Sequence, residues 1–310
     1  MSNVPDSDNL YSKILRELYS PAWLRSSGRE SYAAVAKKLG IDDQTVRSTI
    51  GRMQKSGFLK GWSISLNPHI LGMQCGSVIV KGGERATPSK DKVISQLQDV
   101  EGVVALFSFL DDPGFRLVFF YEDDTDFERK SRLISSICGV IKPYASWQIP
   151  FPPSRMKLKK TDWQIIQSLL GDSRKNVSEI AEEIEVSTRT IRRRLDSMTE
   201  DNSFFPNPIV DASKVDGFLY HFVVAYDNKK DKAKVDQTLH ESTEGIMFVD
   251  TNAELYSVIG AICQNISEAN QISNRLRTQK GVREVTVRVF EDIIPVTGWI
   301  RHEIEKRLRR

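Results

Sequence analysis

Residues 187–198 read STRTIRRRLDSM, and the pattern of this short stretch decides how the segment around it folds. Three apolar residues recur at steps of four and three: Ile191, Leu195 and Met198. On a helix they form one buried stripe, which places Arg189 and Arg193 on the opposite face. Ser187 is a preferred N-cap residue, because its hydroxyl accepts a hydrogen bond from the first turn. The stretch therefore predicts a helix that is apolar on one side and basic on the other.

Two further helical patterns precede this stretch, TDWQIIQSLLGD at 161–172 and NVSEIAEEIEV at 176–186. A helix that packs by one stripe on two others and presents Arg and Thr in its first turns has the layout of a helix-turn-helix recognition helix. Guanidinium groups suit guanine edges and phosphates, and threonine hydroxyls can bind phosphate or base. The predicted DNA contacts are Thr188, Arg189, Thr190, Arg192 and Arg193.

Arg194 lies nearer the apolar stripe than the other arginines do. For this side chain, an ion pair with Glu179 or Glu183 is the alternative to DNA contact. A charged outer face is also usual on any surface helix. The prediction of DNA binding therefore depends on the surrounding elements as much as on the arginines.

The same pattern occurs twice in the chain, at an offset of 145 residues. Six apolar residues of the first copy fall on apolar residues of the second: Val35, Leu39, Ile41, Val46, Ile50 and Met53 on Ile180, Ile184, Val186, Ile191, Leu195 and Met198. Such agreement indicates an internal duplication. The preceding helices align only if the first copy has extra residues, which SPAWLRSSGRE at 20–30 supplies.

The first copy predicts the same three helices, with Gly40 in the turn and Asp42 or Asp43 as the cap of the third. It is less basic than the second copy. The residues on the comparable face are Gln44, Thr45, Arg47, Ser48 and Arg52. Either this helix reads bases with neutral side chains or it has drifted toward packing, and we favour DNA contact.

Each helical unit is followed by the pattern of a one-sided antiparallel sheet with two helices, in the order β-α-β-β-α-β. Strands are predicted near 74–81, 103–109, 115–121, 140–149, 218–226, 246–251, 254–262 and 282–290, and helices near 89–100, 124–138, 231–243 and 267–279. The predicted fold class is α+β, with two three-helix domains alternating with two ferredoxin-like domains.

The expected domains are 1–66 (helix-turn-helix), 67–150 (ferredoxin-like), 151–208 (helix-turn-helix), 209–297 (ferredoxin-like) and 298–310 (a basic C-terminal helix). The prolines of IPFPPSRMKLKK make 149–160 a natural linker, because proline neither joins a ladder nor continues a helix. In the terminal segment, apolar residues recur every four positions among basic ones. We expect this helix to be solvated or to pack in an oligomer rather than to bind phosphate.

Composition narrows the function classes. The chain has 310 residues with a formal net charge of +3, too near balance to indicate a polyanion partner by itself. Its three cysteines, Cys75, Cys138 and Cys263, form no C-x-x-C pair, so we expect buried free thiols. No apolar run approaches the roughly 20 residues that span a bilayer, and the N-terminus does not resemble a signal peptide. We expect a cytoplasmic protein without membrane partners.

The sequence holds no pattern for catalysis or metal binding. Its four histidines, His69, His221, His240 and His302, show no paired spacing, VKGGER lacks the Lys-Ser/Thr of a phosphate-binding loop, and no G-x-S-x-G elbow is present. We therefore predict no enzyme activity, no catalytic residues, no metal and no cofactor.

A helix-turn-helix unit followed by a β-α-β-β-α-β domain resembles the Lrp/AsnC family of prokaryotic, especially archaeal, transcription regulators, here in tandem. Six residues match the family's third helix in order: Ser187, Ile191, Arg193, Arg194, Leu195 and Met198. SGFL at 56–59 and NPHILG at 67–72 resemble its turn into a strand and its hinge. The resemblance implies a regulator that binds double-stranded DNA.

The family dimerises through the sheets of its αβ domains, which implies an internal pseudo-dimer within this chain and a homodimer of chains. Each pair of helix-turn-helix units (here called reading heads) would then bind two DNA half-sites about 34–36 Å apart. The chain's own evidence for self-association is limited to aromatic strand residues such as Phe119 and Tyr121, which are more often core.

Some positions depart from the family pattern. Asn202 and Pro206 replace the expected Gly-Ile wing, and Ser48 and Thr49 stand where the arginine pair would be. Of the family's effector loop, PGFRL and NAELY keep only fragments, so no amino-acid effector is expected. Candidate residues for some other small-molecule effector in these loops are Asp111, Asp112, Arg116 and Glu254.

Two alternatives stay open. Siroheme decarboxylases resemble paired units of this architecture, but their arginine- and histidine-bearing strand motifs are not recognisable in LKGWSISLNP or FSFLDDPGFRLVFF. The other alternative is a protein-interaction adaptor of the transcription machinery, which would show little binding to duplex DNA even at low salt.

Overall fold

The computed structural model describes residues 7–18, 31–81, 89–110, 114–241, 246–251 and 253–309. The extra residues of the first copy, 20–30, lie outside these ranges, and so do the effector candidates Asp111 and Asp112. Helical units and antiparallel sheets alternate along the chain, which confirms the predicted α+β class. The three cysteines are buried and free, as expected.

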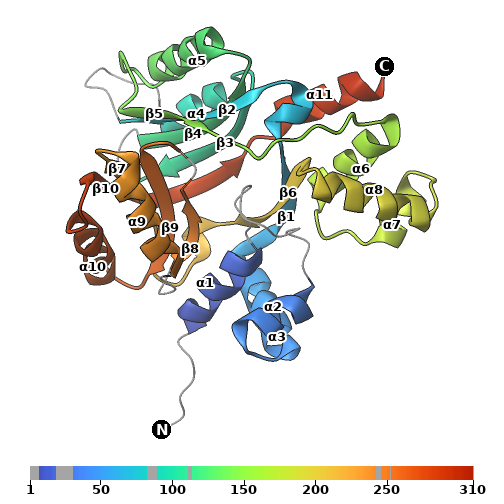
Figure 1. Cartoon of the computed structure of the whole chain (residues 1–310), viewed down its shortest axis with the longest axis horizontal. Helices are drawn as coiled ribbons and strands as arrows, with labels where there is room; N and C mark the ends of the chain where they lie inside the picture. The colour runs from blue at the N-terminus through green and yellow to red at the C-terminus, as the bar shows by residue number, and fades with distance from the viewer. Residues whose placement is uncertain are drawn as a thin grey trace.

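Each half of the chain begins with three helices. They are α1 (Ser7–Leu18), α2 (Tyr32–Leu39) and α3 (Asp43–Lys55) in the first half, and α6 (Lys160–Gly171), α7 (Val177–Glu183) and α8 (Thr188–Glu200) in the second. The first unit lies at the bottom of Figure 1 and the second at the right. Each unit buries the apolar residues that the 145-residue offset aligned, such as Val46 with Ile191 and Met53 with Met198.

A two-stranded antiparallel ribbon joins the two helical units, formed by β1 (Leu59–Leu66) and β6 (Phe204–Val210). The strand β6 was not among the predicted strands, and its Pro206 and Pro208 are unusual in a strand. Here they oppose Ile64 and Trp62 in a ribbon of only two strands, where one edge of each strand needs no partner. Before the ribbon, Asn202 adopts φ +58°, as Gly57 with φ +80° does at the equivalent position of the first copy.

The remaining strands form one eight-stranded sheet in the order β5-β2-β4-β3-β10-β7-β9-β8. They are β2 (Gln74–Val80), β3 (Val103–Phe109), β4 (Gly114–Tyr121), β5 (Ala145–Ile149), β7 (Phe218–Tyr226), β8 (Ile246–Asp250), β9 (Tyr256–Cys263) and β10 (Val282–Pro295). The covering helices are α4 (Lys90–Gln98), α5 (Asp124–Ile137), α9 (Lys229–Glu241) and α10 (Ile266–Arg277). The predicted elements are present, but β5 begins five residues later than expected and β10 runs five residues longer.

The extension of β10 is what joins the two halves. Its C-terminal part pairs with β3 of the first half, and its N-terminal part pairs with β7 of the second. The inner faces of the halves also meet, since the Trp147 and Tyr256 rings stack with their centroids 5.1 Å apart. The expected internal pseudo-dimer is therefore present, while a homodimer of chains stays a prediction. Phe119 and Tyr121 are fully buried and belong to the core.

The helical units are also held by the ends of the chain. The helix α1 packs against β8 of the second half, and the C-terminal helix α11 (Gly298–Leu308) packs on α6 and β3. Ile300 and Ile304 of α11 are buried, and the Arg307 guanidinium lies 5.2 Å from the centre of the Trp163 ring. The terminal helix is thus packed within its own chain rather than left solvated. In the part of the chain that the structure describes, no helix is long and apolar enough to cross a membrane.

Candidate nucleic-acid interface

The helix α8 has the cap and the buried stripe that its sequence predicts. The Ser187 hydroxyl accepts a hydrogen bond from the Thr190 amide at 3.3 Å. Ile191 and Met198 are fully buried and Leu195 nearly so. Because the stripe docks α8 on α6 and α7, the opposite face points away from the unit.

Arg194 does not pair with Glu179 or Glu183, so that expectation is wrong. Its guanidinium donates to both carboxylate oxygens of Asp162 on α6, with Nε 2.5 Å from Oδ1. Asp162 is fully buried and also accepts from the Lys159 amide at 2.6 Å. The carboxylate that caps α6 therefore also anchors α8, which removes Arg194 from the set available to DNA.

Three arginines of α8 face solvent: Arg189, Arg192 and Arg193. Within the described residues, none of them makes an ion pair or side-chain hydrogen bond, although Asp196 and Glu200 lie on the same helix. Thr188 is exposed beside them, whereas the hydroxyl of half-buried Thr190 contacts that of Ser187 at 3.0 Å. The outer face of α8 thus presents cationic donors that no internal partner engages.

The helix α3 presents a different surface. Its N-cap is Asp42, whose carboxylate accepts from the amide and the hydroxyl of Thr45 at 2.8 and 2.5 Å. These hydrogen bonds hold the pKa of the exposed Asp42 carboxyl below its usual value. Arg47 donates to Asp43 at 2.7 Å, and Arg52 donates to Thr49 at 3.0 Å. Of the five residues predicted on this face, Gln44 and Ser48 are the exposed neutral ones.

A stack of side chains joins the two helical units. The Arg47 guanidinium lies 5.4 Å from the centre of the Tyr32 ring, and the Arg174 guanidinium lies 4.9 Å from the same ring. Arg174, from the turn between α6 and α7, also lies 4.8 Å from the centre of the Trp62 ring on β1. Cations this close to ring faces are attracted by the ring quadrupole.

The effector candidates are not brought together. Arg116 was expected in a loop, but it lies within β4 and is only 4% exposed. It donates to Ser77 Oγ at 3.0 Å and lies 3.2 Å from His221 Nε2 of the other half. Sequence reasoning missed this contact because the two residues are 105 positions apart. Burial and the positive charges of Arg116 and Arg288 lower the pKa of His221 well below 6.5.

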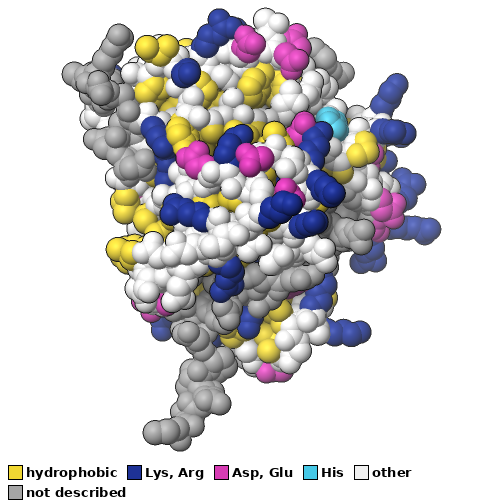
Figure 2. Space-filling view, turned by 60° about the vertical axis from the view of Figure 1, so that its left-hand side comes forward, with side chains coloured by type: hydrophobic (Ala, Val, Ile, Leu, Met, Phe, Trp, Pro, Cys, Tyr) yellow, Lys and Arg dark blue, Asp and Glu magenta, His cyan; other side chains and the backbone are white. Residues whose placement is uncertain are grey.

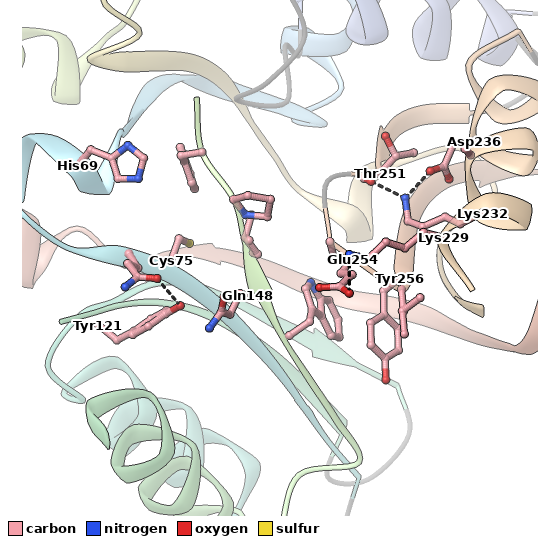
Figure 3. Close-up of a pocket in the computed structure, with 18 residues that line it drawn as sticks. His69, Cys75, Tyr121, Gln148, Lys229, Lys232, Asp236, Thr251, Glu254 and Tyr256 are labelled. Carbon is pink, nitrogen blue, oxygen red and sulfur yellow. Dashed lines mark hydrogen bonds and ion pairs between the residues drawn. The ribbon is translucent and has the colours of Figure 1, made fainter. Parts of the chain in front are cut away.

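Glu254 lies in the connection from β8 to β9 and pairs with Lys229 at 2.8 Å. It lines an open pocket of about 820 Å³ between β5 and α9, drawn in Figure 3. In that view Lys232 lies between Asp236 and Thr251 and binds both. The cations of this pocket are thus neutralised by its own acids.

Arg116 instead lines a separate, partly open cavity of about 220 Å³ beneath the β1–β6 ribbon. Most of the wall is apolar and comes from the ribbon, the sheet and the start of α11, including Ile64, Phe107 and Ile300. In the part of the chain that the structure describes, no group of His, Cys, Asp and Glu is arranged to hold a metal ion.

The face shown in Figure 2 has basic, acidic and apolar side chains interspersed over the αβ halves, with basic side chains projecting at its right-hand edge. Among the residues described on this face, charge of one sign forms no broad patch.

The helical unit that contains α8 is similar to domains of known proteins. The profile of the AsnC-type helix-turn-helix domain matches residues 158–199, which span α6 to α8. The HTH-type transcriptional regulator LrpA of Pyrococcus horikoshii is 30% identical over 132 residues, covering 42% of this chain and 88% of that protein. The chain belongs to the Lrp/AsnC family.

A second relative matches over less of its length. The HTH-type transcriptional regulator Ptr1 of Methanocaldococcus jannaschii is 29% identical over 101 residues, or 32% of this chain and 62% of that protein. Both matches span less than half of the chain, in keeping with an Lrp/AsnC unit that occurs twice here.

The architecture as a whole also has a solved counterpart. The crystal structure of the siroheme decarboxylase NirDL aligns with 97% of this chain and 99% of its own, with a TM-score of 0.53 and 12% sequence identity. At that identity the likeness concerns the fold alone. The overall fold of this chain therefore also occurs in that solved structure.

Proposed function

We propose that this Lrp/AsnC protein is a transcription regulator that occupies promoter DNA through α8. The observation that carries the proposal is the set of exposed arginines on the first two turns of α8, which have no internal ion-pair partner in the described chain. In the helix-turn-helix class, those turns contact base edges in the major groove. Thr188 and Thr190 would add hydrogen bonds to phosphate or base.

The anchoring of α8 suits this role. The buried stripe and the Arg194–Asp162 pair fix the axis of α8 on α6, so the backbone of the helix needs little reorganisation on binding. A helix that is already in place reduces the ordering cost of association. Cytoplasmic location and pairing of chains are part of the same proposal.

A small-molecule effector would act through the 820 Å³ pocket, the concave site that contains Glu254. The connection that carries Glu254 corresponds to the loop in which Asp111 and Asp112 lie in the first half. Glu254 is the effector candidate that lines this pocket, whereas Asp111 and Asp112 lie outside the described residues and stay predictions from the sequence. Arg116 is not part of this site, because it is buried in β4 and lines a different cavity.

The test is a band-shift titration. Its probes are promoter fragments from the source organism that the wild-type protein has been shown to bind. Reversing charge in the variant Arg189→Glu/Arg193→Glu should abolish duplex binding while the protein stays folded, because both side chains face solvent. The control is Arg129→Glu/Arg132→Glu on α5, which reverses two exposed arginines away from α8. Unchanged affinity in the α8 variant contradicts the proposal.

One observation favours a second candidate, a tetrapyrrole enzyme like the siroheme decarboxylase that shares the fold: Arg116 and His221 meet on the inner sheet face. The cavity that Arg116 lines, at about 220 Å³, is smaller than the roughly 300–1,000 Å³ of usual ligand pockets. The regulator is therefore the better reading. A Soret shift on adding iron uroporphyrin III, lost in Arg116→Met, would support the enzyme instead.

A further inference from the structure

The two recognition-type helices differ in charge where they would enter a groove. From the cap through the second turn, residues 42–48 carry two carboxylates, Asp42 and Asp43, and one guanidinium, Arg47. The equivalent residues 187–193 carry three guanidinium groups and no carboxylate. Duplex DNA presents one phosphate charge per about 1.7 Å of helix axis. The net negative end of α3 is therefore repelled where the positive end of α8 is attracted.

The guanidinium at the start of α3 is already engaged. Arg47 pairs with Asp43 within its own helix and lies over the Tyr32 ring of α2. To reach phosphate it would have to leave both contacts and expose Asp43 to the same phosphates. Arg52 and Lys55 lie in the last turn, the end that a recognition helix turns away from the bases.

The ring that Arg47 covers also supports the second helical unit. The Arg174 guanidinium, in the turn that leads into α7, contacts the rings of both Tyr32 and Trp62. Two hydrogen bonds continue this contact: the Ser173 amide donates to the Trp62 carbonyl at 3.4 Å, and Ser63 Oγ donates to the Leu170 carbonyl at 3.0 Å. The first unit and the ribbon thus brace the unit that carries α8.

We infer that one chain reads a single half-site through α8, and that the first helix-turn-helix unit is a brace that positions the second instead of a reading head. An operator with two half-sites then takes two chains. This inference rests on the proposed function and revises the sequence-based expectation for Gln44, Thr45, Arg47, Ser48 and Arg52.

The first experiment compares paired Glu substitutions on α8 and α3 in full-length protein on one duplex. Arg189→Glu/Arg193→Glu should weaken binding at least 100-fold. Gln44→Glu/Ser48→Glu adds two carboxylates to the exposed face of α3 away from the Arg47–Tyr32 contact, and it should change the dissociation constant less than 3-fold. Truncating single arginines to Ala should lower the salt slope by about one for α8 and leave it unchanged for α3. If both pairs weaken binding alike, the single-head inference fails and the proposed function stands. If neither does, the proposed function fails.

The second experiment tests the brace. Tyr32→Leu removes the ring that Arg47 and Arg174 both contact, whereas Tyr32→Phe keeps it. In Tyr32→Leu, amide hydrogen exchange at residues 172–176 should accelerate at least 10-fold and DNA affinity should fall several-fold, and both should be normal in Tyr32→Phe. Equal exchange in wild type and Tyr32→Leu would show that the first unit braces nothing, and hydroxyl-radical protection of two half-sites by one chain would show that it reads DNA.

Discussion

The guanidinium of Arg194 on α8 lies against the buried carboxylate of Asp162 on α6, with two hydrogen bonds between them. The same carboxylate accepts a hydrogen bond from the Lys159 amide at the start of α6. One side chain therefore caps the N-terminus of α6 and holds α8 against it. Of the arginines in residues 187–198, Arg194 therefore stabilises the packing of α8 on α6 and is not available to bind DNA.

Removing this carboxylate should destabilise the second helical unit. Asp162→Ala leaves the Arg194 charge partly buried without its partner, a change that costs about 3–5 kcal/mol of unfolding free energy. Urea denaturation followed by circular dichroism measures it. Glu182→Ala, an exposed change on α7, is the control and should alter stability by less than about 0.5 kcal/mol. Equal midpoints for the two variants would mean that the pair does not support the fold.

A charge in the buried stripe should unfold the same unit. Ile191→Asp places an unpaired carboxylate where no solvent reaches, which costs several kcal/mol. Hydrogen exchange should show loss of protection across α6 to α8 while the eight-stranded sheet keeps its own. Ser178→Asp, at an exposed position of α7, should retain protection throughout. Retained protection in Ile191→Asp would contradict the packing described for α8.

Salt dependence separates a DNA reader from a protein adaptor. Six to ten phosphate contacts predict a fall in affinity of roughly 10³–10⁵-fold between 50 and 200 mM salt. Fluorescence anisotropy with a labelled duplex measures the slope. An adaptor would bind duplex weakly at 50 mM salt and show little further loss, and that result would remove DNA as the main partner.

Stability should fall as the pH drops below neutrality because of His221. Burial and two neighbouring guanidinium groups place its folded-state pKa well below 6.5, so the unfolded chain takes up a proton that the folded chain does not. The free energy of unfolding should therefore decrease as pH falls below about 6.5, by at most about 1.4 kcal/mol per unit for this one group. Urea titrations at several pH values check this, and His221→Gln should flatten the slope in that window. An unchanged slope would assign the effect to other groups.

Much of the helical architecture follows from local pattern. The apolar stripe of α8, its Ser187 cap and the 145-residue repeat are properties of neighbouring residues, and each is present in the structure. The internal pairing of the sheets was expected from the resemblance to the Lrp/AsnC family, and the repeat places two such sheets in one chain. Local periodicity determines these features because it fixes which side of an element is apolar.

Contacts between residues far apart in the sequence could not be predicted from local patterns. Nothing in the pattern around Arg194 distinguishes Asp162 from Glu179 or Glu183 as its partner. Arg116 fell within a strand predicted near 115–121 and was also taken as part of the family's effector loop, and the structure places it in β4 with its side chain buried. The β1–β6 ribbon depends on pairing across 140 or so residues, which outweighed the prolines in β6.

The sequence by itself determined that the chain holds two helical units, each with a capped, one-sided third helix, and two αβ units. Tertiary structure decided which charges stay available. It set Arg194 against Asp162, Arg47 against Tyr32 and Asp43, and left the outer arginines of α8 facing solvent. The physical reason is that helix periodicity gives the direction of a side chain, whereas the pairing of a charge depends on which distant element folds up beside it.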